Sequence, residues 1–508
     1  MKKRIFSVLA VLCMTTGLLA QTTLSDELAF RVKDEAFNRS QIEELAQFMT
    51  DMLGPRLAAS QMKVRAERLV VDKFKEMGLS NPRIDFAADW SKGGWDNEKT
   101  YVAMTVPYYC SFAANPKAWS GSTNGLVKGE CVVMDIKTKA DIEKYKGKLS
   151  GKVVLMPSTQ TYDVSFEPLA TRYTEDELKE MEKDTRPGAR RRPRTAAVDY
   201  AAQRELQAAA AQLIKDENVL AVVSGGGYFN VPTSRGVSYK AGDPEPKPEV
   251  VLPMEDHARM VRLIAAGQKV EMELEIKNKF SDNNKINNVI AEIPGTDPKL
   301  KNEIVLIGAH LDSWHGGTGG ADNASGCIVM MEAMRIIRAL GVSPRRTVRI
   351  ALWGAEEQGL YGSRGYASRY LYDAAKKKAL PGYDQFALYL NVDNGSGRFR
   401  GIYLEDHDMA RPFMEAWKKP FETLGFNTLA PGRTGGTDHM SFTRYGLPAF
   451  QFIQDPLEYF RTYHTVMDTY ERLTLEDLKV DAAIVAGLVL SAALDENKIP
   501  AKPGYPLQ

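Results

Sequence analysis

The sequence predicts an α/β protein built on a doubly wound, mostly parallel sheet. From about residue 285 onward, short continuous apolar runs alternate with segments of helical periodicity. Polar residues suited to chemistry follow the ends of several of these runs. In an open parallel sheet the carboxyl ends of the strands lie at one edge, where ligands bind. These observations together favour a doubly wound sheet with a site at that edge.

The elements of this region follow one another along the chain. The run "EIVLIGA" predicts a strand, and "NASGCIVMMEAMRIIRAL" predicts a helix that is capped by Asp322 or Asn323 and ends at Gly341. Three further strands are predicted from "TVRIALWGA", "FALYLNV" and "LPAFQFI", which have the continuous apolar character of buried parallel strands. The last apolar run, Ala482 to Leu494, is too short to span a bilayer and predicts a buried core helix.

The remainder of the chain differs in character from this α/β region. Residues 24–80 have helical periodicity, whereas residues 105–250 contain short β-rich runs separated by charged, Pro- and Gly-rich segments. We therefore expect an inserted, mostly β domain. The predicted organisation is a leader at 1–20, an N-terminal helical part of the main domain at 21–104, the insertion at 105–250 and the rest of the main domain at 251–508.

The first twenty residues resemble a secretory signal. A basic head precedes an apolar run that ends at the small residue Ala20, which predicts cleavage near Gln21. Cys13 follows Leu12 rather than the small residue that lipid attachment usually requires. We therefore expect a protein exported to the periplasm or the extracellular space, without a membrane anchor after cleavage.

Composition excludes some classes of partner. The chain has 66 Lys and Arg against 65 Asp and Glu, and removal of the three basic leader residues leaves 63 against 65. This balance does not favour nucleic acid as a partner. Three cysteines remain, Cys110, Cys131 and Cys327, too few for a disulfide-dense scaffold. A disulfide between Cys110 and Cys131 stays open, and Cys327 is expected to pack in the core.

Several candidate residues follow the predicted strands. A histidine or a carboxylate stands at or just after the end of three predicted strands, those at 303–309, 347–355 and 386–392. The glycine-rich loop at 316–320 allows the backbone to turn sharply, which brings a further carboxylate back to the same strand ends. A final histidine lies in "RTYHTVMDT". The candidates are His310, Asp322, Glu356, Glu357, Asp393 and His464.

Two histidines and three carboxylates suit a pair of divalent metals, with zinc preferred. If Asp322 bridges, one ion takes His310 and Asp393, and the other takes Glu357 and His464. Open positions then remain for a shared water. Two such ions can polarise a carbonyl and activate that water.

Asp312 lies two residues beyond His310 and is placed to orient its imidazole. A His-x-Asp pair alone usually marks a surface or capped loop. The later Asp322, inside a glycine-rich loop, makes the functional interpretation stronger.

Each of the other candidates also has an ordinary structural explanation. The Glu356–Glu357 pair alone would suit a solvated helix start, Asp393 a turn, and His464 a core position. Their order at successive strand ends favours one shared site. His439, in a glycine-rich loop, is expected either to contact the substrate or transition state or to cap the following turn.

The motifs carry a resemblance to a known group of enzymes. In order, "AHLDSWHGGTGGADNASG", "WGAEEQGLYGS", "NVDNG", "GGTDHMSF" and "YHTVMDT" resemble the co-catalytic zinc exopeptidases, which include bacterial leucyl aminopeptidases and the plasma glutamate carboxypeptidase group. The helical opening with "GPRLAAS" is similar to theirs, and the insertion resembles their protease-associated domain. The resemblance covers nearly the whole mature chain.

The resemblance implies specific roles and two zinc ions. Glu356 would be the general base and Asp312 the aspartate that orients the histidine, whereas Tyr463 and Ala59 depart from the common pattern. The implied metal ligands are His310, Asp322, Glu357, Asp393 and His464.

The expected activity is hydrolysis of terminal peptide bonds by a secreted zinc exopeptidase, with an aminopeptidase favoured. The alternatives are a carboxypeptidase or dipeptidase on the same core, a non-catalytic peptide-binding or receptor-like protein, and a glutaminyl cyclase-like acyltransferase. The intact set of ligands and base favours an enzyme, and peptides are the expected partners.

Overall fold

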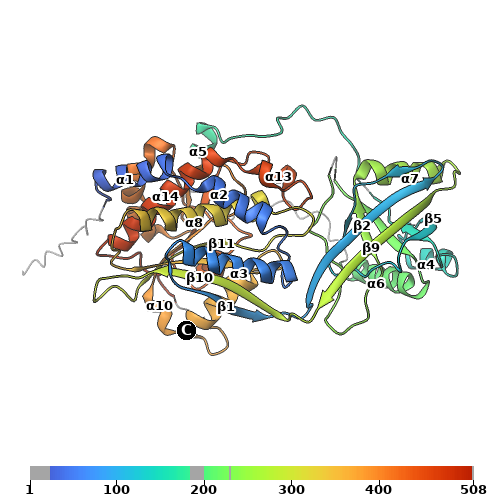
Figure 1. The fold of residues 1–508 in the computed structure, drawn as a ribbon, viewed down its shortest axis with the longest axis horizontal. Helices are drawn as coiled ribbons and strands as arrows, with labels where there is room; N and C mark the ends of the chain where they lie inside the picture. Colours follow the sequence, from blue (N-terminus) through green and yellow to red (C-terminus); the bar gives the residue numbers. More distant parts are fainter. Residues whose placement is uncertain (1–22, 159, 184–199, 228–229, 506–508) are drawn as a thin grey trace, which may run out of the picture.

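The chain forms two lobes, each built around its own sheet (Figure 1). The structure is a computed structural model that describes residues 23–158, 160–183, 200–227 and 230–505. The predicted leader at 1–20 lies outside these residues. No helix in the described part of the chain combines the length and apolar character that a membrane span requires.

The first lobe contains an eight-stranded sheet in the order β1-β10-β12-β11-β15-β18-β16-β17. Its strands are β1 (Ser80–Asp89), β10 (Lys285–Ile293), β11 (Ile304–His310), β12 (Thr347–Trp353), β15 (Phe386–Asn391), β16 (Phe399–Tyr403), β17 (Thr428–Ala430) and β18 (Ala449–Gln454). The four central strands β12, β11, β15 and β18 run parallel, whereas β1, β10 and β16 pair antiparallel with their inner neighbours. The sheet is therefore mixed, with the predicted parallel strands at its centre.

Helices cover both faces of this sheet, which confirms the doubly wound α/β fold. The larger core lies between the sheet and one layer of helices. That layer comprises α1 (Asp26–Asn38), α2 (Ile42–Gln47), the π-helical turn η1 (Phe48–Met52), α3 (Gln61–Glu76), α8 (Ser325–Ala339), α11 (Arg411–Lys418) and α14 (Leu475–Leu494). The other face carries α9 (Tyr361–Tyr370), α10 (Pro381–Gln385) and α12 (Met440–Thr443).

Two helices show how well the sequence patterns predict local structure. α14 contains the apolar run at 482–494 and is buried along nearly its whole length, as predicted for a core helix. α8 is followed by Gly341 in the left-handed conformation, which ends it where the sequence indicated. Its amino end is reached through a π-helical turn, and Asn323 Oδ1 accepts the N–H of Gly326 (3.0 Å). Asp322 makes no such cap, because its carboxylate faces two histidines.

The second lobe contains another eight-stranded sheet, in the order β3-β2-β9-β5-β6-β7-β8-β4. Its strands are β2 (Gly94–Val106), β3 (Cys110–Ser111), β4 (Asn115–Pro116), β5 (Val127–Val133), β6 (Val153–Leu155), β7 (Ala221–Gly225), β8 (Glu249–Leu252) and β9 (Glu271–Ser281). The helices α4 (Lys139–Tyr145), α6 (Tyr200–Asp216) and α7 (Met254–Ala265) accompany it. The long pair β2 and β9 joins the lobes (Figure 1), so this sheet begins before residue 105 and ends after residue 250.

One segment of the predicted insertion packs on the first lobe instead. Helix α5 (Glu175–Glu182) lies against β17, far from the second sheet (Figure 1). Just before it, Thr171 and Leu457 exchange backbone hydrogen bonds of 3.1 and 2.8 Å. Arg172 pairs with Asp455 (2.8 Å) and Asp477 (2.7 Å). This segment therefore forms a second connection between the lobes.

All three cysteines of the described chain carry free thiols. Cys110 is on β3 and Cys131 on β5, with β2 and β9 between them. Three strand spacings separate the two residues by about 14 Å, well beyond the Cα separation that a disulfide permits. The disulfide that the sequence left open is therefore absent. Cys327 is fully buried in the larger core, as expected.

Candidate active site

The predicted site residues gather at the carboxyl edge of the central parallel strands. His310 is the last residue of β11, Glu356 and Glu357 follow β12, and Asp393 follows β15. These three strands are neighbours in the sheet, in the order β12-β11-β15. Because parallel strands end at the same edge, residues separated by up to 83 positions in the printed sequence lie side by side.

Asp322 lies between two groups of potential metal ligands. Its Oδ1 is 3.2 Å from His310 Nε2, which also lies 3.7 Å from Asp393 Oδ2. Its other oxygen, Oδ2, is 2.9 Å from His464 Nε2, which lies 2.8 Å from Glu357 Oε2. One carboxylate thus offers an oxygen to each histidine, which is the geometry required of a bridging ligand.

Backbone geometry delivers Asp322 to this position. Gly319 adopts a left-handed conformation with φ 58°. A Cβ on Gly320 would lie 2.3 Å from the carbonyl oxygen of Thr469, so a side chain there could not be accommodated. The turn that follows is fixed from outside, because Asp468 accepts the N–H groups of Ala321 (2.6 Å) and Asp322 (3.1 Å).

His464 is held partly by the second lobe. It follows the short helix α13 (Tyr459–Thr462) and has a left-handed backbone with φ 56°. Its carbonyl oxygen accepts the N–H of Thr233 (2.8 Å), and Val466 N–H donates to the carbonyl of Val231 (3.0 Å). The second lobe therefore contributes to the placement of one candidate ligand.

Asp312 contacts more of the site than the sequence indicated. The Nδ1 of His310 lies 2.9 Å from the backbone oxygen of Asp312 and 3.8 Å from its carboxylate. The carboxylate instead accepts the backbone N–H groups of Glu356 (3.1 Å) and Glu357 (3.3 Å). Asp312 thus orients the imidazole through its main chain and fixes the two glutamates through its side chain.

The carboxylates around His310 and His464 raise the pKa values of both imidazoles. Burial disfavours the charged form of His310, but the charges of Asp393 and Asp322 outweigh burial and raise its pKa well above the usual value. Burial also opposes the charge on His464, whose hydrogen bonds to Asp322 and Glu357 raise its pKa to about 10. Without a metal, both imidazoles therefore hold a proton near neutral pH.

The two adjacent glutamates lie in different groups. Burial raises the pKa of Glu356 well above its usual range, the charge of His310 opposes this and the charge of Asp393 adds to it. Burial raises the pKa of Glu357 to about 8, and the charge of Asp322 adds to the rise. Glu357 Oε2 also accepts the indole N–H of Trp314 (2.9 Å).

These residues fit a pair of metal ions. Ligand atoms of His310, Glu356 and Asp393 lie within 4.8 Å of one another, and so do those of Asp322, Glu357 and His464. Glu357 Oε1 is buried without a hydrogen-bond partner among the described residues, as a ligand oxygen reserved for a cation would be. Imidazole and carboxylate donors are those that zinc prefers.

His439 belongs to neither group of potential metal ligands. It is fully buried, and its Nε2 is 3.3 Å from Glu405 Oε1. The charges of the site act on the preceding residue, Asp438, whose pKa burial raises to about 7. The charge of His310 opposes this rise, and the charges of Asp312 and Asp393 add to it. Asp438 is part of the motif "GGTDHMSF", in which the sequence analysis named only the adjacent histidine as a candidate.

Arg56 is a further residue that sequence reasoning did not identify. Its guanidinium is fully buried and donates to five backbone carbonyls. One belongs to Leu311, next to His310, and two belong to Thr318 and Gly319 in the glycine loop. Arg56 thus joins the two loops that carry His310 and Asp322. Arg56 lies in the motif "GPRLAAS", where a single arginine gives no local signal of such a role.

This chain is similar to known peptidases in sequence and in fold. Residues 288–489 match the sequence profile described as "Peptidase family M28". Mouse carboxypeptidase Q is 24% identical over 455 residues, which cover 89% of this chain and 85% of that protein. A peptidase M28 precursor from Shewanella amazonensis has a similar structure, with a TM-score of 0.65, 22% identity and coverage of 94% of this chain and 99% of that one. A zinc aminopeptidase from Bacillus subtilis gives a TM-score of 0.55, 19% identity and coverage of 93% and 96%.

Proposed function

Because this chain belongs to peptidase family M28 through residues 288–489 and is a metallo-exopeptidase, we propose that it removes residues one at a time from the free amino end of peptides. The observation that carries the proposal is the shared carboxylate of Asp322, which faces a histidine on either side. This arrangement suits hydrolysis assisted by two metals.

Two zinc ions are the proposed cofactors. His310 and Asp393 would hold one, Glu357 and His464 the other, and Asp322 both. When bound, such a pair polarises the scissile carbonyl and lowers the pKa of a water molecule. The zinc aminopeptidase from Bacillus subtilis, which shares the fold, supports zinc as the metal.

Glu356 is the proposed general base. The residue is 8% exposed, its carboxylate lies beside His310 and Asp393, and its backbone N–H donates to Asp312. It would take a proton from the attacking water and deliver it to the leaving amine. General acid–base catalysis of this kind contributes roughly 10²–10⁴ in rate.

Charge supports the amino end of the substrate over the carboxyl end. The carboxylates in and beside the two groups include those of Asp322, Glu356, Glu357, Asp393 and Asp438, and that of Asp312 lies 3.8 Å from His310 Nδ1. Two divalent ions would supply four positive charges, so the site keeps a net negative charge when these carboxylates are ionised. A protonated amino end is attracted to such a site, and a terminal carboxylate is repelled.

Export to the periplasm or the extracellular space completes the proposal. It depends on the leader-like residues 1–20, whose basic head and apolar run suit a cleaved signal.

Carboxypeptidase action is the second candidate function, because mouse carboxypeptidase Q aligns with most of the chain.

A panel of peptides tests the direction of cleavage. One tripeptide is supplied free, N-acetylated, C-amidated and blocked at both ends, together with a free dipeptide and a peptide that begins with glutamine, and products are identified by mass. We expect the free and C-amidated peptides to lose their first residue, while the N-acetylated one stays intact. The reverse pattern would establish a carboxypeptidase. Cleavage of the free dipeptide alone would establish a dipeptidase, and loss of ammonia from the N-terminal glutamine would establish a cyclase.

Metal analysis after dialysis tests the proposed cofactors. We expect about two zinc ions per chain, because four potential ligands are arranged around one bridging carboxylate. Binding of peptides without turnover by the fully loaded protein would instead indicate a receptor-like role. A stoichiometry near zero, with thermal stability unchanged on adding zinc, would contradict the metal site.

A further inference from the structure

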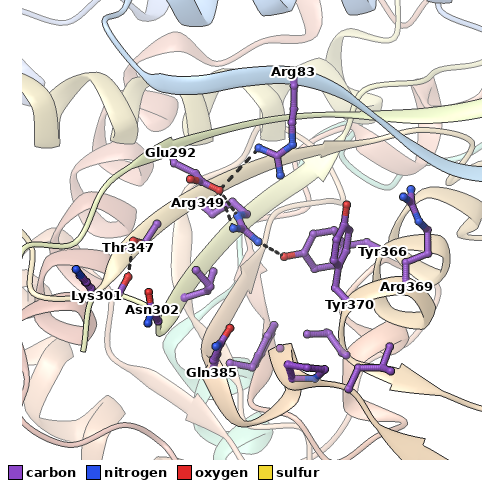
Figure 2. A pocket seen from close by; sticks show the side chains of 16 residues that line it. Arg83, Glu292, Lys301, Asn302, Thr347, Arg349, Tyr366, Arg369, Tyr370 and Gln385 are labelled. Atoms are coloured by element: carbon purple, nitrogen blue, oxygen red, sulfur yellow. Dashed lines mark hydrogen bonds and ion pairs between the residues drawn. The ribbon is translucent and has the colours of Figure 1, made fainter. Parts of the chain in front are cut away.

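A second cavity lies at the opposite edge of the first sheet. It has a volume of about 680 Å³ and is bounded by the sheet, α9 and α10 (Figure 2). Ile304, the first residue of β11, lines it, whereas His310 ends the same strand at the metal site. Six residues of strand separate the two by about 20 Å. The cavity is therefore distinct from the proposed active site.

An arginine fixes the wall of this cavity. Arg349, on β12, donates to the carboxylate of Glu292 (2.8 and 2.6 Å) and to the hydroxyl of Tyr366 (2.6 Å). Its side chain is 18% exposed, and Figure 2 shows it between these two partners. Since Glu292 is engaged by Arg349, it has little capacity left to neutralise other cations.

Three further cations surround the same space. Arg83 approaches Glu292 only to 3.8 Å and Asp85 to 3.9 Å, and Arg369 approaches Asp85 only to 4.0 Å. These separations are at the outer limit of an ion pair. Lys301 lines the cavity on the side of β11. Arg83 also donates to the backbone oxygen of Asn81 (3.3 Å), and Arg369 donates to that of Phe86. Their side chains remain 30% and 40% exposed, so each keeps N–H groups for a ligand.

The charges around the cavity do not balance. Four basic side chains line it, and Glu292 is the one acid among its lining residues. Adding the nearby Asp85 still leaves an excess of two positive charges. Arg guanidinium groups bind carboxylate and phosphate oxygens through paired N–H donors. An anion that contacts Arg83 and Arg369 would neutralise this excess.

We propose that this cavity binds a small dianion, either a dicarboxylate or a phosphate. Arg83 and Arg369 are the primary contacts, and Lys301 supplies a third positive charge. The amide groups of Asn302 and Gln385 line the same space and can donate hydrogen bonds to the bound oxygens (Figure 2). The site is separate from the peptidase function, and its test does not depend on catalysis.

Binding of succinate and of inorganic phosphate to the zinc-loaded full-length protein tests the proposal. Titration calorimetry is performed at an ionic strength matched with sodium chloride. We expect saturable binding of at least one of the two anions, and the stronger of them identifies the oxygen chemistry that the site prefers. Absence of saturable binding by both would overturn the proposal.

Matched variants locate the binding. Arg83→Gln and Arg369→Gln remove the primary contacts, whereas Arg364→Gln removes an exposed arginine of the same helix α9 that does not line the cavity. We expect the first two to weaken binding at least about tenfold each, and Arg364→Gln to leave it unchanged. Equal affinity in all three variants would overturn the assignment. Circular dichroism and zinc content confirm that each variant is folded and loaded.

Discussion

Asp468 fixes the backbone of the candidate bridging ligand, Asp322. Its two carboxylate oxygens accept the N–H groups of Ala321 and Asp322, at 2.6 and 3.1 Å. Burial raises the pKa of Asp468 to about 7, and the charge of Asp322 adds to the rise, while these two N–H groups oppose it. The turn is held so that each oxygen of Asp322 faces a different histidine. Asp468 therefore acts as a positioning residue for the proposed metal site.

Replacing Asp468 with Asn should weaken zinc binding. An amide NH₂ group would face one of the two backbone N–H donors, so the turn should lose its fixed geometry. Changes in groups that orient metal ligands typically cost about 10–100-fold in affinity. We would measure zinc affinity by competition with a chromogenic chelator, with the exposed Asp408→Asn as the control. Unchanged affinity in Asp468→Asn would refute the positioning role.

Glu356 and Glu357 should respond differently to the same substitution. Glu356→Gln keeps its size and polarity but loses basicity, so it should retain both zinc ions and turn over roughly 10²–10⁴ more slowly. Glu357→Gln removes a charged ligand, so it should lose affinity for one ion and regain activity in excess zinc. Metal content and turnover are measured across a zinc titration. If Glu356→Gln loses metal while Glu357→Gln stays loaded and inactive, the roles are reversed.

Arg56 should be essential for stability. Replacement by Met leaves five buried carbonyl groups without their donor, which should lower the free energy of unfolding by at least about 3 kcal/mol. Arg56→Lys should recover part of this loss, since an ammonium has three donors. Urea unfolding measures both variants against the exposed Arg364→Met, which is expected to lie within about 0.5 kcal/mol of the parent. A decrease of only about 0.5 kcal/mol in the free energy of unfolding of Arg56→Met would contradict this prediction.

Zinc binding should release protons. Without metal the pKa of His464 is about 10 and that of Glu357 about 8, so both groups are mainly protonated near neutral pH. Zinc requires their deprotonated forms, so its affinity should rise with pH up to about 10, the higher of these two pKa values, and fall on acidification. Calorimetry in buffers of different ionisation enthalpy measures the released protons. Binding heats that are independent of the buffer would contradict this prediction.

The sequence determined the four central strands of the first sheet and the order of the candidate ligands along them. Each central strand is a continuous apolar run, so a buried parallel strand could be identified locally. His310 and Asp393 follow such runs, and parallel strands that start together must end together. This rule predicts that distant residues meet at one edge, and the structure brings them together there.

Tertiary structure alone decided what holds these residues in place. Arg56 donates to Leu311, 255 residues away, and Asp468 accepts from Asp322, 146 residues away. Their partners are backbone groups, which are identical in every residue and leave no pattern in the sequence. The pairing of β2 with β9 and the packing of α5 against β17 are likewise contacts between segments far apart in the sequence, which only the folded chain brings together. Local periodicity reports which face of a segment is buried, whereas the choice of partner depends on the packing of the whole chain.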